Sequence, residues 1–452
     1  MFDSIRQSCP DAKSIQVFCG VGNNAGDGYI IARLAMEAGL RVSVIQLGDK
    51  SLQGDALKAQ QLYIAKKGKI ETFNTDVKNH QTDIIIDALF GTGLIRTVTG
   101  EWKQAIEIMN QSDAYIASVD IPSGLNADTG AIMGCAVVAD ETTTFIARKQ
   151  GLYTGKARDV VGKLLFSDLG IDKSLKNQLA KQRAVYLLSK NIPKLTKRKP
   201  SSYKGSHGHV LLIGGAPGMS GAIKMAAEAA LTVGAGLVSV ITHPDHAAWL
   251  NINRPELMVK GVESATQLTP YLQRANVIAI GPGLGTSSWG QSLFHACLAT
   301  SHDKIIDADA LSLLSKLSMK QDNWVLTPHV GEAARLLGVS ISDIERDRFY
   351  AANKIQQNFS GLCVLKGAGS LIADGDATSI LELGNAGMAV AGMGDVLTGV
   401  IAGLRAQGLS LQSALRLGVS LHAKAADIAV VKKGERGLFA TDLYPYLREL
   451  VN

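Results

Sequence analysis

The sequence predicts an α/β protein with two domains, each built from parallel βα units. Two observations support this prediction. Short segments rich in Val and Ile end in Gly, Pro or Asp and alternate with helical patterns, which is typical of parallel βα units. The alternation stops at a basic stretch near residues 190–200 and then starts again. A chain of 452 residues with 46% hydrophobic side chains is long enough for two such domains.

The order of these segments places each expected element. Strands are expected at 14–19, 41–47, 83–90 and 114–121, with a helix at 28–40. After the basic stretch, strands are expected at 209–215, 237–242, 276–283, 304–309, 323–328 and 363–369, with a helix at 222–236. We therefore expect one domain over residues 1–190 and a second over residues 200–452. In parallel sheets ligands collect at the carboxyl ends of strands, so the polar residues that follow strands matter most.

Composition excludes several classes of protein. The first residues lack the apolar core of a signal peptide, and no apolar run approaches the ~20 residues of a membrane span. The absence of a CxxC pair argues against a disulfide framework or a zinc site; the cysteines are Cys9, Cys19, Cys135, Cys297 and Cys363. The net charge is +6, and we interpret the basic stretch 194–204 as a solvated linker. We expect a cytoplasmic protein without nucleic-acid or membrane partners.

The stretch GVGNNAGDGY, residues 20–29, joins the first strand to the first helix. Gly20, Gly22 and Ala25 satisfy the loose G-x-G-x-x-G/A pattern of dinucleotide-binding loops. The match is weak because the second strand, RVSVIQL, ends without the acid that this fingerprint needs. Asp27, expected in the first helical turn, would also repel a phosphate there. A hydride-transferring oxidoreductase is therefore a weak candidate.

Two further strands of the first domain end in carboxylates. One finishes at Asp87, before Gly91, and another at Asp120, before Ser123. If these ends are neighbours, oxygens of Asn24, Asp87 and Ser123 can coordinate a hard cation. Asp120 then remains as an acid/base or sugar-binding carboxylate. For each Asp alone, a helix or turn cap is an equal alternative.

Three ordered motifs, NNAGDGYIIAR, DALFGTGL and SVDIPSGLNADTG, resemble the YjeF-type N-terminal domain, the NAD(P)HX epimerase, over roughly residues 15–170. The resemblance implies a Rossmann-like three-layer αβα fold, a potassium ion held by Asn24, Asp87 and Ser123, and Asp120 as the catalytic carboxylate on the substrate. It also implies two substrate-binding segments, which are Asn23, Asn24, Ala25, Gly26 and Asp27, and Gly91, Thr92, Gly93, Leu94, Ile95, Arg96 and Thr97.

The implied substrate is a reduced nicotinamide cofactor hydrated at C6 of its ring. Its R and S forms can interchange if the hydroxyl leaves and returns through an iminium, which a carboxylate can assist. Family members carry a helical segment before the first strand, whereas only residues 1–13 precede it here. We therefore expect a shortened N-terminus, and a first domain that only binds ligand or mediates oligomerisation is an alternative.

The second domain contains NAGMAVAGMGDVLTGVIAGL, residues 385–404. Gly392, Met393 and Gly394 open an apolar helix, whose free N–H groups and dipole favour phosphoryl oxygens. Asp395 follows in the first turn and can accept a proton from a hydroxyl that attacks phosphorus. The alternative is a helix start of small residues packed against a neighbour.

Other strand ends supply further groups for phosphoryl transfer. Lys366 opens the segment KGAGS, and its side-chain ammonium can contact a bound nucleotide. His329 and Glu332 follow another strand, and Glu332 can reach magnesium directly or through water. Asp307 and Asp309 are metal or substrate candidates, with capping as an equal alternative. No GxxxxGK[ST] sequence is present, which argues against a P-loop enzyme.

Six ordered motifs over residues 203–452, GGAPGMSGA, GPGLG, DADAL, TPHVGE, KGAGS and NAGMAVAGMGDVLTG, resemble the ribokinase-like fold and, within it, the ADP-dependent (S)-NAD(P)H-hydrate dehydratases of the YjeF C-terminal family. The resemblance implies Mg²⁺, nucleotide contacts at Lys366, Gly367, Ala368, Gly369, Ser370 and Gly394, and substrate contacts at Ala222, Gly283, His329 and the catalytic Asp395.

Together the two resemblances imply a bifunctional repair enzyme. The first domain would epimerise NADHX and NADPHX, and the second would dehydrate the S form with ADP. The alternative is a ribokinase-like small-molecule kinase with a non-catalytic Rossmann-like binding domain. Either ADP or ATP fits the same glycine loop, so ADP follows from the resemblance alone. We also expect a homo-oligomer.

Overall fold

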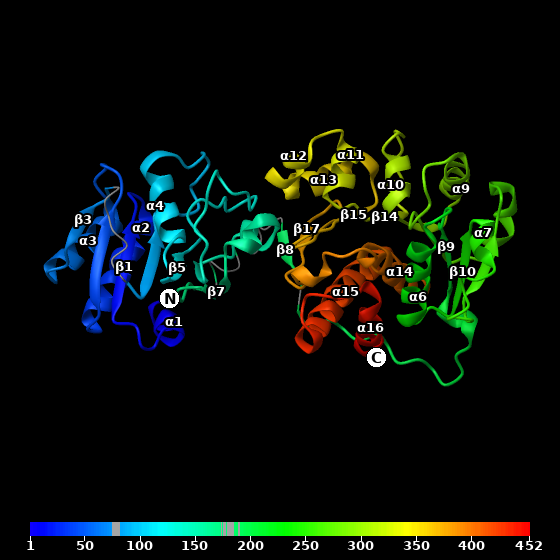
Figure 1. The fold of residues 1–452 in the computed structure, drawn as a ribbon, viewed down its shortest axis with the longest axis horizontal. Helices are drawn as coiled ribbons and strands as arrows, with labels where there is room; N and C mark the ends of the chain where they lie inside the picture. The colour runs from blue at the N-terminus through cyan, green and yellow to red at the C-terminus, as the bar shows by residue number, and fades with distance from the viewer. Residues whose placement is uncertain (75–81, 173, 175–177, 179–184, 189) are drawn as a thin grey trace. The chain divides into compact units, whose positions relative to one another are not determined.

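The computed structural model describes residues 1–74, 82–172, 174, 178, 185–188 and 190–452. The chain divides into two compact units, Met1–Arg183 and Ala184–Asn452 (Figure 1). We call them the N-terminal and the C-terminal unit. Within the described ranges, no helix combines the length and the hydropathy needed to cross a membrane.

The N-terminal unit contains a seven-stranded sheet of order β3-β2-β1-β4-β5-β6-β7, and all neighbouring strands run parallel. Its strands are β1 (Ser14–Cys19), β2 (Arg41–Gln46), β3 (Ile70–Thr72), β4 (Ile84–Ala88), β5 (Tyr115–Val119), β6 (Glu141–Phe145) and β7 (Lys163–Ser167). Its described helices are α1 (Phe2–Ser8), α2 (Asn23–Glu37), α3 (Gly54–Ala65), α4 (Gly100–Asn110) and the 3-10 turns η1 (Gln150–Tyr153) and η2 (Gly155–Asp159).

Helices cover both faces of this sheet, as the three-layer prediction requires. One core joins α1, α2 and α3 to Val17 and Ile86, while the other joins α4 to Phe18 and Ile85, on the opposite face of the same strands. The helix α2 lies unusually close to the sheet at Gly28. A Cβ there would lie 2.7 Å from that of Ala88, so only glycine fits.

The C-terminal unit contains a ten-stranded sheet of order β11-β10-β9-β12-β13-β14-β15-β16-β17-β8. Its strands are β8 (Val185–Leu187), β9 (His209–Ile213), β10 (Leu237–Thr242), β11 (Met258–Gly261), β12 (Val277–Ile280), β13 (Asp303–Ile306), β14 (Trp324–Leu326), β15 (Leu362–Leu365), β16 (Leu371–Ala373) and β17 (Thr378–Ile380). Neighbouring strands run parallel except β16, which is antiparallel to both β15 and β17.

Figure 1 shows α10 to α13 on one side of this sheet and α6, α14, α15 and α16 on the other. The helices are α6 (Ser220–Thr232), α7 (Pro244–Ala247), α8 (Thr269–Leu272), α9 (Ser288–Leu298), α10 (Ala308–Leu314), α11 (Val330–Leu337), α12 (Ile341–Arg346), α13 (Arg348–Phe359), α14 (Met393–Ala406), α15 (Leu411–Lys433) and α16 (Tyr444–Val451), with the 3-10 turns η3 (Lys204–His207), η4 (Ala265–Gln267), η5 (Ala386–Met388) and η6 (Ala440–Leu443). The apolar α14 packs between the sheet and α15, so its N-terminus is fixed at the sheet edge.

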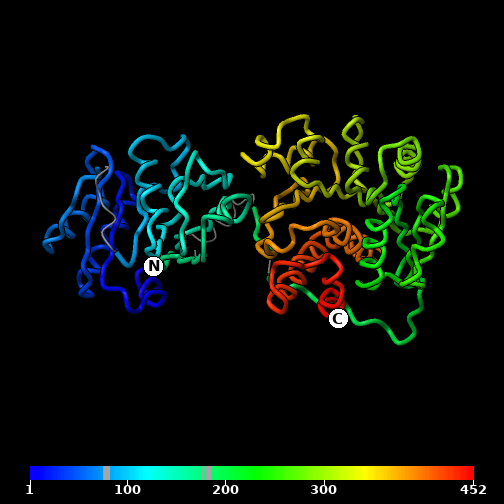
Figure 2. Tube along the Cα trace, in the orientation of Figure 1, coloured from blue at the N-terminus to red at the C-terminus, as the bar shows by residue number. Residues whose placement is uncertain are grey.

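The structure differs from the sequence expectations at several places, and β3, β6, β7, β8, β11, β16 and β17 are not among the expected strands. The strand β8 pairs with β17 of the C-terminal sheet, although residues up to 190 were expected in the first domain. The expected linker passes beside α15 and α16 (Figure 2); its Leu195, like Ile192 just before it, packs on the core there instead of being solvated. Asp27 lies beyond the first turn because α2 already begins at Asn23. The antiparallel strand β16 interrupts the expected parallel order.

Candidate functional site

A buried carboxylate, Asp87, lies one residue before the end of β4 in the N-terminal unit. It is fully buried and accepts hydrogen bonds from Ser123 Oγ at 2.5 Å, from Ser123 N at 2.8 Å and from Ser118 Oγ at 2.8 Å. Burial raises the pKa of Asp87, and the bonds from Ser123 and Ser118 offset part of the rise. Two strand ends that are 36 residues apart in the chain therefore meet at this carboxylate.

Asn24 joins the same cluster through the backbone of Phe90. Its Nδ2 donates to the carbonyl of Phe90 at 2.9 Å, while the amide of Phe90 donates to Ser123 Oγ at 2.8 Å. A Cβ on Gly91 would lie 3.6 Å from that of Asn24. Asn24, Asp87 and Ser123, which are expected to hold a cation, thus lie around the turn that follows β4. Within the described ranges, no group of three or more His, Cys, Asp or Glu side chains is placed to bind a metal.

Asp120 follows β5 in a strained conformation. Its φ of +66° lies in the left-handed region that side-chain-bearing residues seldom adopt. Its Oδ1 accepts from Thr144 Oγ1 at 3.1 Å and from Phe145 N at 3.0 Å, and it also pairs with the ammonium of Lys149. Sequence reasoning missed Lys149, because a lysine in a loop after a strand carries no distinguishing pattern.

The two predicted substrate segments lie at this edge of the sheet. Ala25 and Gly26 are buried in α2, whereas Asn23 and Asp27 are exposed. Desolvation by the surrounding protein, with a smaller contribution from the negative charge of Asp120, raises the pKa of Asp27 although much of its surface is exposed. The segment 91–97 forms the loop between β4 and α4, with Leu94 buried and the remaining side chains largely exposed.

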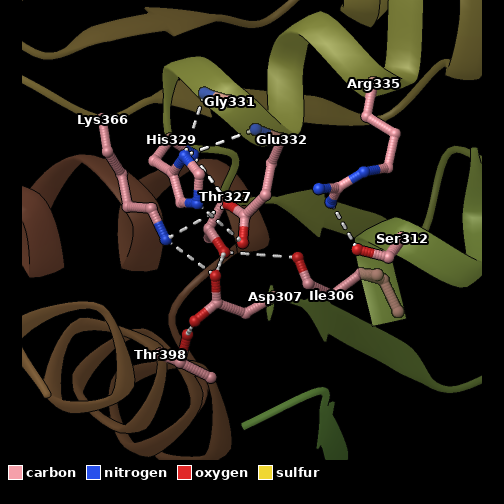
Figure 3. Close-up of polar contacts among 10 residues, drawn as sticks. All are labelled: Ile306, Asp307, Ser312, Thr327, His329, Gly331, Glu332, Arg335, Lys366 and Thr398. Carbon is pink, nitrogen blue, oxygen red and sulfur yellow. Dashed lines mark hydrogen bonds and ion pairs between the residues drawn. The ribbon is translucent and has the colours of Figure 1, made fainter. Parts of the chain in front are cut away.

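In the C-terminal unit, Asp307 is the centre of a polar network (Figure 3). It follows β13, is 1% exposed, and accepts from Lys366 Nζ at 2.8 Å, Thr327 Oγ1 at 2.7 Å and Thr398 Oγ1 at 2.8 Å. Burial works to raise the pKa of Asp307, but Lys366 and the hydroxyl donors hold it below its ordinary value. Asp307 is therefore an ionised partner that fixes Lys366, and neither of its oxygens is free.

Lys366 follows β15 and faces a second carboxylate. Its Nζ lies 3.8 Å from Glu332 Oε2, an oxygen that also accepts from the amide of His329 at 2.8 Å. Burial works to lower the pKa of Lys366, yet Asp307 and Glu332 together hold it above its ordinary value. His329 caps α11 through Nδ1, which accepts from Gly331 N at 2.9 Å. Glu332 and His329 therefore both cap α11 and face the site.

The N-terminus of α14 adjoins this lysine. A Cβ on Gly394 would lie 3.1 Å from Lys366 Nζ and 3.7 Å from Asp307 Oδ2, so glycine permits the close approach. Asp395 lies in the first turn of α14. Burial, reinforced by the charge of Asp307 and opposed by Lys366, raises the pKa of Asp395 to about 7. A carboxylate of this kind exchanges protons at neutral pH, as a general base requires.

The remaining predicted residues lie around these groups. A Cβ on Gly283 would lie 3.4 Å from that of Ala222, which brings two predicted substrate contacts together. Asp309 accepts from the amide of Gly285 at 2.8 Å and so fixes the loop after β12. The buried Arg348 donates to the carbonyl of Lys366 at 3.2 Å and supports the KGAGS segment. Sequence reasoning missed Arg348 and Thr398, which lie inside helical patterns.

Comparison with known proteins gives consistent matches to both units. Residues 1–151 match the family model described as the YjeF-related protein N-terminus, and residues 210–449 match that of NAD(P)H-hydrate dehydratase. The bifunctional NAD(P)H-hydrate repair enzyme Nnr of Coxiella burnetii is 46% identical over 100% of this chain and 93% of that protein. The enzyme of the same name from Escherichia coli is 45% identical over 100% of this chain and 87% of that protein.

A solved structure also matches the C-terminal unit. It is an ADP/ATP-dependent NAD(P)H-hydrate dehydratase from Bacillus subtilis co-crystallised with ATP and Mg²⁺. Its TM-score is 0.50 at 26% identity, over 57% of this chain and 98% of that one.

Proposed function

Since this chain belongs to the family of bifunctional NAD(P)H-hydrate repair enzymes, we propose that it returns hydrated NADH and NADPH to their active forms. The N-terminal unit would interconvert the R and S hydrates, and the C-terminal unit would dehydrate the S form with ADP, giving AMP and phosphate. The observation that carries the proposal is the placement of Asp395 and Lys366 together at the N-terminus of α14.

In the C-terminal unit, Asp395 takes the proton of the ring hydroxyl, whose oxygen attacks the terminal phosphorus of ADP while the bond from phosphorus to AMP breaks. Phosphate then leaves C6 of the ring, a proton leaves C5, and the double bond of the dihydropyridine forms. Lys366 and the free N–H groups of α14 stabilise the negative charge that develops on the transferred group. Asp307 keeps the ammonium of Lys366 in place.

Magnesium would assist this transfer by neutralising phosphate charge. Both oxygens of Glu332 already face partners, since Oε2 accepts from the His329 amide and Oε1 lies 3.4 Å from His329 Nε2. Glu332 would therefore hold the ion through water, and the nucleotide would supply the direct ligands.

In the N-terminal unit, Asp120 would assist the hydroxyl at C6 in leaving and returning. Asn24, Asp87 and Ser123 would hold potassium, because one buried carboxylate with neutral oxygens suits a weakly charged hard cation. The ion would offset the charge of Asp87 and order the loop that begins at Gly91. The homo-oligomer stays a prediction.

The test is recovery of NADH absorbance from a mixture of R and S hydrates with magnesium and potassium. Full recovery with ADP, faster than spontaneous epimerisation, is the expected result. Recovery that stops at the S fraction would remove the epimerase from the proposal. Failure with both ADP and ATP, together with phosphorylation of a stable alcohol, would favour the small-molecule kinase.

A further inference from the structure

Lys149 is a largely buried cation in the N-terminal unit, and it has no role in the epimerisation as described above. It lies between β6 and η1 and exposes 16% of its side chain. Its ammonium pairs with Asp120 Oδ1 and also donates to the carbonyl of Phe145 at 2.9 Å. These two acceptors together define the position of the ammonium.

The hydrogen bonds of Asp120 are distributed unequally between its two oxygens. All three side-chain and amide donors, from Lys149, Thr144 and Phe145, reach Oδ1. Within the described part of the chain, no donor reaches Oδ2. An oxygen that is anchored three times holds its carboxylate rigidly, while the other oxygen keeps its lone pairs for an external group.

A capping role alone does not account for this arrangement. The bonds from Thr144 and Phe145 already tie Asp120 to the end of β6. Burying a further cation beside the carboxylate costs desolvation that a structural contact does not need. The left-handed φ of Asp120 also stores strain, and such strain concentrates at functional sites.

Building on the epimerase proposed for this unit, we infer that Lys149 is the positioning residue of the epimerisation. Its ammonium holds Oδ1 and balances the charge of Asp120, so that Oδ2 is directed to the hydroxyl at C6 of the hydrate. When the hydroxyl leaves, Oδ2 faces the cationic ring, and the ammonium on the other oxygen keeps the carboxylate from turning away.

The adjacent Arg148 provides a matched control. Its guanidinium lies 5.1 Å from the centre of the Phe166 ring and donates to Tyr153 OH at 3.4 Å, and no contact with Asp120 is formed. Replacing Arg148 by Met removes the same charge from the same loop without touching Asp120.

The experiment measures conversion of purified R hydrate into S hydrate by the full chain, without ADP, for the parent and for Lys149→Met, Lys149→Arg and Arg148→Met. We expect Lys149→Met to lower kcat about a hundredfold with KM changed less than about threefold, because oriented acid–base catalysis contributes on the order of 10² or more. Lys149→Arg should keep most of the rate, and Arg148→Met should match the parent. Dehydration of S hydrate with ADP, performed by the other unit, should be equal in all four proteins.

Chemical rescue separates positioning from a purely structural role. In Lys149→Ala, added ethylammonium should restore epimerisation in a saturable way, whereas tetramethylammonium, which cannot donate a hydrogen bond, should not. A kcat of Lys149→Met within threefold of the parent would overturn the inference. Loss of rate that neither arginine nor ethylammonium restores would overturn it too. If the parent itself does not epimerise the R hydrate, the result contradicts the proposed function of this unit and not only the role of Lys149.

Discussion

Replacement of Asp395 by Asn should remove dehydration and at the same time stabilise the C-terminal unit. The pKa of Asp395 is raised from 3.8 to about 7 in the folded protein. Between these two pH values the unfolded chain loses the proton while the folded chain keeps it, so stability falls as pH rises through this window. Asparagine has nearly the same shape and no proton to lose, so the stability of the variant does not fall in this way as pH rises.

The size of the effect follows from the pKa difference. A shift of about 3 units corresponds to about 4 kcal/mol at most. Asp395 is only partly buried and water screens part of its charge, so we expect about 2–3 kcal/mol. This increase in the free energy of unfolding of Asp395→Asn over the parent should be fully present at pH 8 and absent below about pH 4.

The assay is urea unfolding followed by tryptophan fluorescence. Trp249, Trp289 and Trp324 lie in the C-terminal unit, and a Trp102→Phe background removes the signal of the N-terminal unit. Asp245→Asn is the control, because that side chain is 68% exposed and should change stability little. An Asp395→Asn protein no more stable than the parent at pH 8, or still active in dehydration, would refute the reasoning.

Three further predictions follow from the same contacts. Dehydration at saturating substrate should fall about tenfold per pH unit below pH 7, because Asp395 must be ionised to accept a proton; a rate unchanged at pH 5.5 would contradict this. Asp307→Asn should destabilise the C-terminal unit by about 3 kcal/mol in urea unfolding, because Lys366 loses its counter-charge; a change below about 1 kcal/mol would argue that the pair is screened. Asp87→Asn should make epimerisation independent of potassium in a titration with KCl, and retained activation would place the ion elsewhere.

The inner strands of both sheets could be predicted from the sequence, whereas the outer strands β3, β6, β7, β8, β11, β16 and β17 could not. Runs such as SIQVFC and HVLLIGG are apolar because both faces of a parallel strand are covered; the first forms β1 at the expected residues, and the second forms β9, which ends at Ile213. The same geometry brings the carboxyl ends of parallel strands to one edge, so the convergence of Asn24, Asp87 and Ser123 also followed from the sequence. The family, too, could be recognised from ordered motifs at these strand ends.

The partners of each charged group were decided by the tertiary structure alone. The sequence allows Asp307 to bind metal, bind substrate or cap a helix, yet its oxygens are occupied by Lys366 and Thr398, which lie 59 and 91 residues away along the chain. Lys149 reaches Asp120 from another strand connection, 29 residues away. No local pattern encodes such pairs, because they depend on which strands are neighbours and on how deeply each side chain is buried. The raised pKa of Asp395 has the same origin, since burial and surrounding charges set it and the sequence specifies neither.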